Sequence, residues 1–462
     1  MSAKLIPGES LGAVGVKRRP GEEGKSRLKN SIRFGRDFHK IGIVFATWTI
    51  PVFLFAADWP QWRGPHRDGI SSETGLLKEW PKDGPKLVWR VADIGSGYST
   101  PSIVGDRVYL LSNEGLENES VIVLNAADGK KVWETRAGKV GNPKQQPSYP
   151  AARSTPTVDG KFLYALGSDG DLVCLETATG KKRWQKSLRA DFGGEPGIWA
   201  YSESPLVDGD VLVCTPGGTN ATMVALKKES GETIWKCAMP QGDQAAYASA
   251  VVMNTGGRKQ YVQFLQKGLV GVDAKDGSLL WRYEKTAKSS PANIPTPVVD
   301  DGYVYSGAGR SGGGLVKVKL AEAKSGAASE TPFEAQEIYF TPKLPVSIGG
   351  AVKIGLNLFG TTGQALVCAD FVTGTIKWEE RSIAPASVCY ADGRLYLHGE
   401  NGDLALVESV ADGYHEKGRF TPPEQPNRGQ SKAWAYPAIA NGKLYIRDAS
   451  VLWCYDIRAE GK

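Results

Sequence analysis

The residues best suited to chemistry are aromatic and polar side chains that stand just ahead of regularly spaced, strand-forming segments. They are Tyr98, Tyr149, Arg153, Trp199, Tyr201, Glu203, Tyr247, Asn293, Trp434 and Tyr436. An arginine suits a planar acidic ligand and a carboxylate suits a cation. Aromatic rings stack on a flat ring or grip a partner peptide. If the strands surround one channel, these side chains converge on a single funnel. Alternatively, they plug the channel mouth and hydrogen-bond to one another.

The sequence gives little support to metal or thiol chemistry. The four histidines are scattered, and the six cysteines lie in apolar phrases such as 172–176 (LVCLE). Neither a C-x-x-C motif nor an adjacent pair of cysteines occurs. We therefore expect no metal site, and we expect the cysteines to be small core residues.

A short phrase, glycine followed by three residues and tryptophan, recurs along the chain. Its copies are 129–133 (GKKVW), 180–184 (GKKRW), 231–235 (GETIW), 277–281 (GSLLW) and 374–378 (GTIKW). Successive copies are about fifty residues apart, a period typical of propellers and other repeat folds. The last interval is about twice as long, which predicts a degenerate copy inside it.

The tryptophans of these phrases are predicted to be structural. A four-stranded blade cannot bury both of its faces, so neighbouring blades stack and a large ring fills the space between them. The glycine supplies the positive φ of the preceding tight turn. The tryptophans expected to pack between blades are Trp89, Trp133, Trp184, Trp235, Trp281 and Trp378.

The number of blades follows from eight phrases of small residues or proline that each precede a strand, such as 99–101 (STP) and 154–156 (STP). The C-terminal unit, 435–455, has three strands, whereas the strand at 86–91 has no repeat before it. We therefore predict an all-β fold, an eight-bladed β-propeller of four-stranded antiparallel blades over residues 86–458. Its last blade is closed by the N-terminal strand near Trp89, which removes open edges. Residues 58–85 are expected to form an irregular lead-in.

Residues 1–57 form a basic leader with ten basic and four acidic residues, which accounts for the whole net charge of +6. The remaining chain is neutral, so the charge gives no argument for nucleic acid. The apolar run 41–57 fits a secretory signal that ends in small residues. It also fits a membrane anchor, although Pro51 and a length just short of about 20 residues disfavour a stable span.

The phrases 125–133 (NAADGKKVW) and 273–281 (DAKDGSLLW) resemble the repeat of the PQQ-binding-like β-propeller family, over about residues 86–458. That family includes eight-bladed quinoprotein dehydrogenases, which hold pyrroloquinoline quinone (PQQ) and calcium above the central channel. It also includes the non-enzymatic outer-membrane assembly lipoprotein. The lead-in 59–65 (WPQWRGP) looks like that of exported propellers from planctomycete-type bacteria.

The resemblance leaves the activity open. The alcohol-oxidising branch carries a disulfide between neighbouring cysteines, a Glu/Asn/Asp set for calcium and an Asp base. This chain has no adjacent cysteines, and no motif places the other groups. A haem-attachment C-x-x-C-H motif and the lipidated cysteine of the lipoprotein branch are also absent from this sequence. A fold by itself does not define a function.

Three functions remain open. The first is an exported scaffold of the periplasm or cell envelope, which holds a protein or small ligand at the central funnel. The second is a PQQ- and calcium-dependent oxidoreductase of alcohols or sugars. The third is a carbohydrate-binding propeller. We expect a monomer that meets a membrane only through its N-terminal segment, with PQQ and calcium as cofactors only under the second hypothesis.

Overall fold

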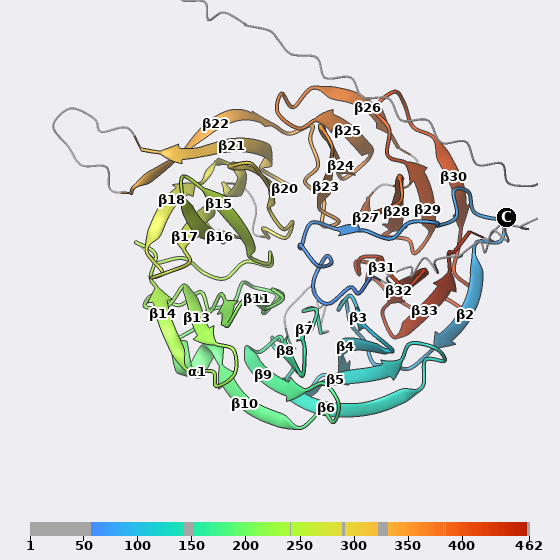
Figure 1. Ribbon diagram of the computed structural model, residues 1–462, viewed down its shortest axis with the longest axis horizontal. Helices are drawn as coiled ribbons and strands as arrows, with labels where there is room; N and C mark the ends of the chain where they lie inside the picture. The colour runs from blue at the N-terminus through green and yellow to red at the C-terminus, as the bar shows by residue number, and fades with distance from the viewer. Residues whose placement is uncertain are drawn as a thin grey trace, which may run out of the picture. The chain divides into compact units, whose positions relative to one another are not determined.

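Eight sheets, each with four antiparallel strands, follow one another along the chain and surround a common centre (Figure 1), and a short parallel strand from the lead-in joins one of them. In this computed structural model the described residues are 57–142, 144, 152–240, 242–288, 292–321, 331–381, 383 and 385–459. They belong to one compact unit, Phe55–Lys462. The leader up to residue 56 and Tyr149 lie outside the described residues. The predicted eight-bladed all-β propeller is confirmed.

The first seven blades each use four consecutive strands, ordered from the channel to the rim. Blade 1 contains β3 (Ser102–Val104), β4 (Arg107–Glu114), β5 (Asn118–Asn125) and β6 (Lys131–Lys139). Blade 2 contains β7 (Thr157–Asp159), β8 (Phe162–Leu166), β9 (Asp171–Glu176) and β10 (Lys182–Ser187). Blade 3 contains β11 (Leu206–Asp208), β12 (Val211–Cys214), β13 (Met223–Lys227) and β14 (Thr233–Cys237). Blade 4 contains β15 (Val251–Thr255), β16 (Arg258–Phe264), β17 (Leu269–Asp273) and β18 (Leu279–Tyr283).

The remaining blades keep this order until the ring closes. Blade 5 contains β19 (Val298–Asp300), β20 (Tyr303–Ala308), β21 (Gly312–Leu320) and β22 (Phe333–Thr341). Blade 6 contains β23 (Ala351–Ile354), β24 (Asn357–Thr361), β25 (Leu366–Asp370) and β26 (Ile376–Glu380). Blade 7 contains β27 (Ala386–Ala391), β28 (Arg394–Gly399), β29 (Leu404–Glu408) and β30 (Glu416–Phe420). Blade 8 contains β31 (Ala438–Ala440), β32 (Lys443–Asp448), β33 (Val451–Asp456) and, at its rim, β2 (Lys86–Val91).

Blade 8 confirms the predicted closure. Strand β2 pairs antiparallel with β33, and Trp89 lies opposite Cys454. The first strand of the ring therefore completes the sheet that contains the last one. All six cysteines are buried and free. The helices among the described residues are α1 (Leu188–Phe192) and a 3₁₀ turn, η1 (Lys285–Ala287), and neither is long and apolar enough to cross a membrane.

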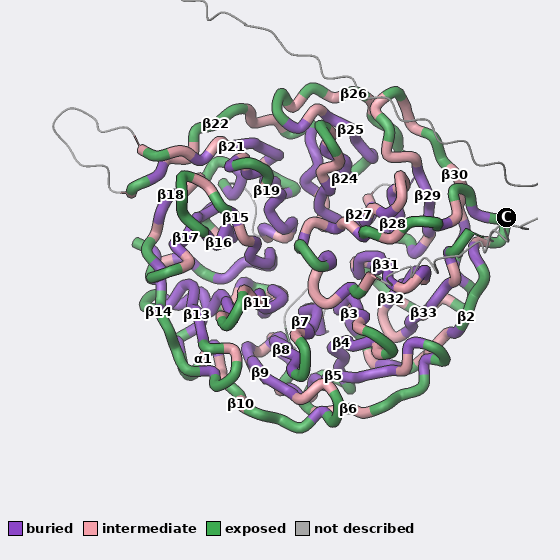
Figure 2. Tube along the Cα trace, in the orientation of Figure 1, coloured by how far each residue is buried: buried purple, intermediate pink, exposed green. Residues whose placement is uncertain are grey.

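Burial explains why these segments form strands. The middle strands of each blade pack between neighbouring sheets, so both faces are apolar, as in β17, where every residue is buried (Figure 2). The rim strands carry exposed residues interspersed with partly or fully buried ones. Most carry a β-bulge just before the repeated aromatic ring. In β14, for example, Trp235 pairs with Ala225 and Thr233 with Leu226, which leaves Ile234 unpaired. Bulges twist and blunt an edge that would otherwise recruit further strands.

The repeated glycine and tryptophan meet across the seams between blades. The ring of Trp235 lies against Gly277 of the next blade, where an added Cβ would come within 2.6 Å of the indole. The indole nitrogen donates to the carbonyl of Ala274, 3.2 Å away. The same arrangement joins Trp89 to Gly129, Trp133 to Gly180 and Trp184 to Gly231. In four of the five phrases the glycine therefore makes room for the tryptophan ring of the preceding blade.

Blade 5 is the degenerate copy that the long interval predicts. Tyr339 takes the place of the tryptophan, since its ring lies on Gly374 and its hydroxyl donates to the carbonyl of Phe371, 2.9 Å away. The tryptophan of the preceding blade also differs. Trp281 is fully buried and donates to the side chain of Gln260 in its own blade, 2.6 Å away. The contact between a tryptophan of one blade and the glycine of the next is thus altered on both sides of blade 5.

The lead-in threads the channel. It begins with backbone hydrogen bonds between Trp59 and Ile103 of blade 1 and ends with β1 (Ile70–Ser71), which pairs parallel with β27 of blade 7. Between these points it bonds to segments of blades 2, 3, 5 and 6, and Ser71 also donates to Ile439 of blade 8. Figure 1 shows this stretch, in blue, crossing the centre of the ring. We call residues 58–71 the axial plug.

Candidate functional site

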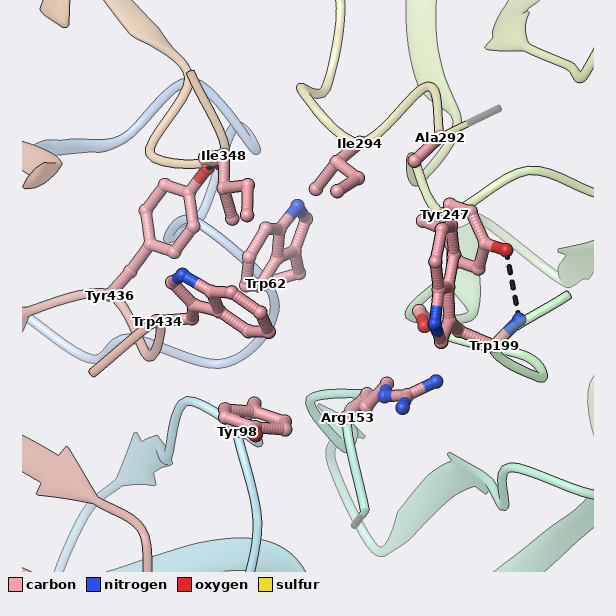
Figure 3. Close-up of a pocket in the computed structure, with 11 residues that line it drawn as sticks. Trp62, Tyr98, Arg153, Trp199, Tyr247, Ala292, Ile294, Ile348, Trp434 and Tyr436 are labelled. Atoms are coloured by element: carbon pink, nitrogen blue, oxygen red, sulfur yellow. Dashed lines mark hydrogen bonds between the residues drawn. The ribbon is translucent and has the colours of Figure 1, made fainter. Parts of the chain in front are cut away.

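A cavity of about 260 Å³ lies at the centre of the ring. The segments that enter the innermost strands supply most of its wall, and the axial plug supplies Trp62 (Figure 3). The described residues that line it are Trp62, Tyr98, Arg153, Trp199, Ser202, Tyr247, Ala292, Ile294, Ile348, Trp434 and Tyr436. We call this cavity the axial pocket.

Six of the ten residues expected to form the funnel line the axial pocket: Tyr98, Arg153, Trp199, Tyr247, Trp434 and Tyr436. The other described members of that set lie outside its lining. Tyr201 is buried and donates to the carbonyl of Pro216, 2.7 Å away. Asn293 is buried and donates to the carbonyl of Leu265, 2.7 Å away. Glu203 is also buried and accepts hydrogen bonds from Thr215 and Gln263.

The remaining lining residues were missed by sequence reasoning, although some signals were present. Ser202 lies in the same aromatic segment as Trp199, and Ile294 follows Asn293 directly. Ile348 precedes a glycine pair that marks the start of blade 6. Trp62 belongs to the lead-in, which has no repeat equivalent and therefore gave no indication of where it would lie.

Aromatic rings form the walls of the axial pocket in three pairs. Trp62 and Tyr436 meet edge to face with ring centroids 4.7 Å apart. The centroids of Tyr98 and Trp434 are 5.2 Å apart, and those of Trp199 and Tyr247 are 6.0 Å apart. Figure 3 shows Trp62, Trp434 and Tyr436 on one side of the pocket and Trp199 with Tyr247 on the other. The walls therefore present flat, mostly apolar faces across a narrow space.

Hydrogen bonds hold several of these rings in place. The Tyr247 hydroxyl accepts from the backbone nitrogen of Trp199 at 3.0 Å, and the Tyr436 hydroxyl donates to the carbonyl of Ile348 at 2.6 Å. The indole nitrogen of Trp62 donates to the Thr296 hydroxyl at 2.8 Å. Such bonds fix the walls before any ligand enters, which lowers the entropy cost of binding.

Arg153 carries the only side-chain charge among the described lining residues. Burial lowers the pKa of its guanidinium from the ordinary value of 12.5, while Tyr98 and Tyr247 act in the opposite direction. A third group that acts on it is Glu119, a buried carboxyl that accepts two hydrogen bonds from Ser168. Burial raises the pKa of Glu119 to about 7. A guanidinium stays protonated under these conditions, so the pocket has a cationic side.

A second buried acid lies near the axial plug. Burial raises the pKa of Glu203 to about 7 and lowers that of Arg67 to about 10, and each charge partly offsets the shift of the other. Arg67 donates to the carbonyls of Ser204 and Pro205, at 2.8 and 3.2 Å. These contacts attach the plug to blade 3.

The side chains that line the axial pocket meet only part of what PQQ and calcium require. Flat aromatic walls and one guanidinium suit a planar acidic ring. Calcium, by contrast, prefers six to eight oxygen ligands that usually include carboxylates. No carboxylate lines the pocket among the described residues, and these residues contain no group of three or more His, Cys, Asp or Glu that could hold a metal. The calcium half of a quinoprotein site therefore does not fit the described residues.

An eight-bladed ring of Gly-x-x-x-Trp repeats around an aromatic pocket defines a PQQ-like β-propeller. The chain belongs to the family described as "Outer membrane protein assembly factor BamB", whose model matches residues 70–154 and 117–354.

Two curated relatives illustrate the two branches of this class. The chain is 25% identical over 292 residues to "Quinoprotein alcohol dehydrogenase PedH" of Pseudomonas putida, covering 59% of this chain and 45% of that protein. It is also 25% identical over 226 residues to "Outer membrane protein assembly factor BamB" of Alkalilimnicola ehrlichii, covering 49% of this chain and 52% of the relative. The chain thus spans about half the length of the curated relatives it matches.

Solved structures support the fold. BamB from Moraxella catarrhalis superposes with a TM-score of 0.56 at 14% identity, covering 81% of this chain and 98% of the other. The computationally designed protein Ika8 gives a TM-score of 0.51 at 8% identity, covering 80% and 99%. At such identities the likeness concerns the fold alone.

Proposed function

We propose that this chain is a binding scaffold of the cell envelope, which holds a protein partner or a small ligand at the axial pocket and does not catalyse a reaction there. The observation that carries this proposal is the chemistry of the pocket. Its described lining consists of aromatic rings, aliphatic side chains, one serine and one arginine. Catalytic sites usually combine a nucleophile or metal with a positioned base. No Asp, Glu, His, Cys or Lys is among these lining residues.

A site-specific photo-crosslinker tests the proposal. We would place a photoreactive amino acid at Ile198, which is 50% exposed beside Trp199, and at Val132, which is 41% exposed on rim strand β6. Crosslinking would be done in envelope extracts of the host. We expect a distinct partner at Ile198 and none at Val132. Absence of any adduct at Ile198, or the same adducts at both sites, would contradict binding at the pocket face.

The chain is further proposed to be exported to the periplasm or cell envelope as a monomer. The motivation is the basic leader with its apolar run 41–57, together with relatives named as outer-membrane assembly factors. N-terminal sequencing of the protein from its host tests this, because cleavage after the apolar run is expected to leave a mature chain that starts near Asp58. An intact leader in the membrane pellet would favour an anchor.

A PQQ-dependent oxidoreductase is the second candidate. Its support is the relative named quinoprotein alcohol dehydrogenase and the three tryptophans in the pocket wall. Dye-linked oxidation of alcohols or sugars after addition of PQQ and calcium would establish it. If PQQ produces neither a spectral nor a thermal shift, this candidate is eliminated.

A further inference from the structure

The charge in the axial pocket is one-sided. Arg153 contributes the guanidinium, and no acidic residue is among the described lining residues. Glu119, the acid that acts on Arg153, lies outside the lining and is held by Ser168. A guanidinium prefers the planar oxygens of a carboxylate, which it can bind with two parallel hydrogen bonds. The charge pattern therefore favours an anion over a neutral or cationic ligand.

Polar and apolar groups are also separated within the pocket. The indole nitrogen of Trp199 is buried and has no hydrogen-bond partner among the described residues. In Figure 3 this nitrogen and the Arg153 guanidinium are turned toward the same side, whereas Ala292, Ile294 and Ile348 lie on the opposite side. A ligand with its acceptor at one end and an apolar ring at the other would match both ends.

The space between the walls limits the size of that ligand. A volume of about 260 Å³ is slightly below the ~300–1,000 Å³ of pockets for drug-sized molecules. Facing aromatic walls favour a flat ring, because offset or edge-to-face ring contacts contribute beyond the area that they bury. One small ring system with a single acidic substituent is therefore the best match.

We propose that the axial pocket binds a planar aromatic ring that carries one carboxylate, without a metal, with the ring between the Trp199 and Trp434 walls and the carboxylate at Arg153. The ligand is either a free aromatic acid or the C-terminal aromatic residue of a polypeptide, which share this chemistry. This inference rests on the proposed binding function and specifies the ligand of the same site.

Other ligand classes fit less well. A sugar offers many hydroxyls, whereas the described lining contains no Asn, Gln, Asp or Glu to receive them. A quaternary cation would favour the aromatic rings, but Arg153 opposes its charge. A tricarboxylate such as PQQ would bring three acidic groups to a single guanidinium. The described lining also lacks the carboxylates that would hold its calcium ion.

Isothermal titration calorimetry with the purified protein tests the proposal, because it measures affinity without relying on the fluorescence of the indole probes. The probes are indole-3-carboxylate, neutral indole-3-methanol and cationic tryptamine, each with and without EDTA. We expect the carboxylate to bind at least about tenfold more tightly than the other two, as hydrogen bonds to charged groups would provide. EDTA should make no difference. Equal affinities for the three probes, or loss of binding in EDTA, would overturn the proposal.

Variants locate the binding site. Arg153→Gln should remove the preference for the carboxylate, and Arg153→Lys should restore only part of it because an ammonium lacks the planar fork. Arg183→Gln on the rim, where the side chain is half-exposed, is the matched control and should bind as the parent does. If Arg153→Gln fails to fold, Trp199→Phe, which keeps an aromatic ring and removes the N–H group, should weaken carboxylate binding several-fold. Retained preference in Arg153→Gln, or unchanged affinity in Trp199→Phe, would overturn the proposal.

Two further experiments distinguish a free aromatic acid from the C-terminus of a polypeptide, and the proposed ligand from PQQ and from the scaffold function alone. A short peptide ending in a free C-terminal tryptophan is compared with its C-terminal amide; binding of the free acid alone assigns the site to a chain end, and binding of indole-3-carboxylate alone assigns it to a small acid. Calcium-dependent binding of PQQ with no binding of either aromatic acid would overturn the inference. A partner crosslinked at Ile198 without any binding of aromatic acids would reject this ligand class and leave the scaffold function standing.

Discussion

Two groups of tryptophans in this molecule differ in the partners of their indole nitrogens. At the seams, Trp89, Trp133, Trp184 and Trp235 donate to backbone carbonyls of the next blade, at 3.0 to 3.2 Å. At the axis, Trp62 and Trp434 donate to the side chains of Thr296 and Glu400, and Trp199 has no partner among the described residues.

This difference separates packing from recognition. A seam ring packs on a glycine of the next blade and donates to its backbone, so packing and hydrogen bonding account for its position. The axial rings instead line a cavity, and Trp199 keeps an indole N–H group without a partner among the described residues. A buried polar group without a partner is costly and usually has a reason. The number of tryptophans in a sequence is thus less informative than the bonding of each indole.

Alanine replacements are expected to give the largest difference in stability between a seam tryptophan and an axial tryptophan. Trp235→Ala should lower the free energy of unfolding by about 3–5 kcal/mol, because it empties a seam that the structure cannot fill. Trp199→Ala should cost about 1 kcal/mol or less, because its ring already borders a cavity. Urea unfolding followed by circular dichroism measures both. Equal losses would mean that the axial ring is also a packing element.

The pH dependence of stability separates the axis from the rim. The pKa of Glu203 is raised by burial from 4.5 to about 7. Between these pH values the unfolded chain releases a proton that the folded protein keeps, so stability falls as pH rises, by on the order of 3 kcal/mol at most. Glu203→Gln should remove that fall and leave stability near pH 4 unchanged.

Glu379→Gln, at an exposed position of the rim, is the control and should retain the pH dependence of the parent. Urea midpoints at pH 4.5 and pH 8 supply the readout. An unchanged slope in Glu203→Gln would contradict the role assigned to burial. Glu119, whose pKa is also raised to about 7 by burial, contributes a similar fall that remains in this variant.

Two glycines with similar backbone conformations separate the cost of a positive φ from the cost of contact with a tryptophan ring at a seam between blades. Gly277 and Gly257 have φ values of +77° and +74°, but an added Cβ meets the Trp235 ring at 2.6 Å in the first and nothing within 4 Å in the second. Both alanine variants should lose about 1–2 kcal/mol to the left-handed conformation. Gly277→Ala should lose about 1–3 kcal/mol more through overpacking. Equal thermal shifts would show that the ring contact does not determine stability.

Replacement of tryptophan by phenylalanine, which removes the N–H group but keeps one aromatic ring, gives the smallest expected effect. Trp184→Phe deprives the Lys228 carbonyl of its donor and should cost about 0.5–1.5 kcal/mol. Trp199→Phe removes a nitrogen that has no partner among the described residues, so its stability should stay within about 0.5 kcal/mol of the parent. Paired urea titrations measure the difference. A larger loss in Trp199→Phe would reverse the comparison.

The ring was predictable from sequence because its determinants are local and repeated. The phrase of glycine, three residues and tryptophan specifies a turn and an aromatic side chain on the outermost strand of a blade. Even the copy with Tyr339 was predicted, from the doubled interval between the last two phrases. The axial plug was not predictable. Several of its anchors are hydrogen bonds from side chains to backbone carbonyls far away in sequence, such as that from Arg67 to Ser204, and no periodic pattern marks such contacts.

For the axial pocket, the sequence indicated which segments lie at the channel but not which of their side chains line the cavity. Residues 199–203 were predicted to lie at the channel. Trp199 and Ser202 line the axial pocket, whereas Tyr201 and Glu203 are buried and bond elsewhere. Side chains of an extended chain alternate between faces, so their direction depends on the register. Ala200, with a φ of +76°, shifts that register in a way that composition does not reveal.

The closure of blade 8 has a consequence for how the protein is made. Strand β2 is synthesised before every other strand of the ring, whereas its partner β33 is synthesised after all of them. No closed structure exists until both are present, and long-range pairing of this kind slows folding. The edge of β33 therefore stays unpaired until the first and the last strand of the ring meet, so the two ends of the propeller fold together.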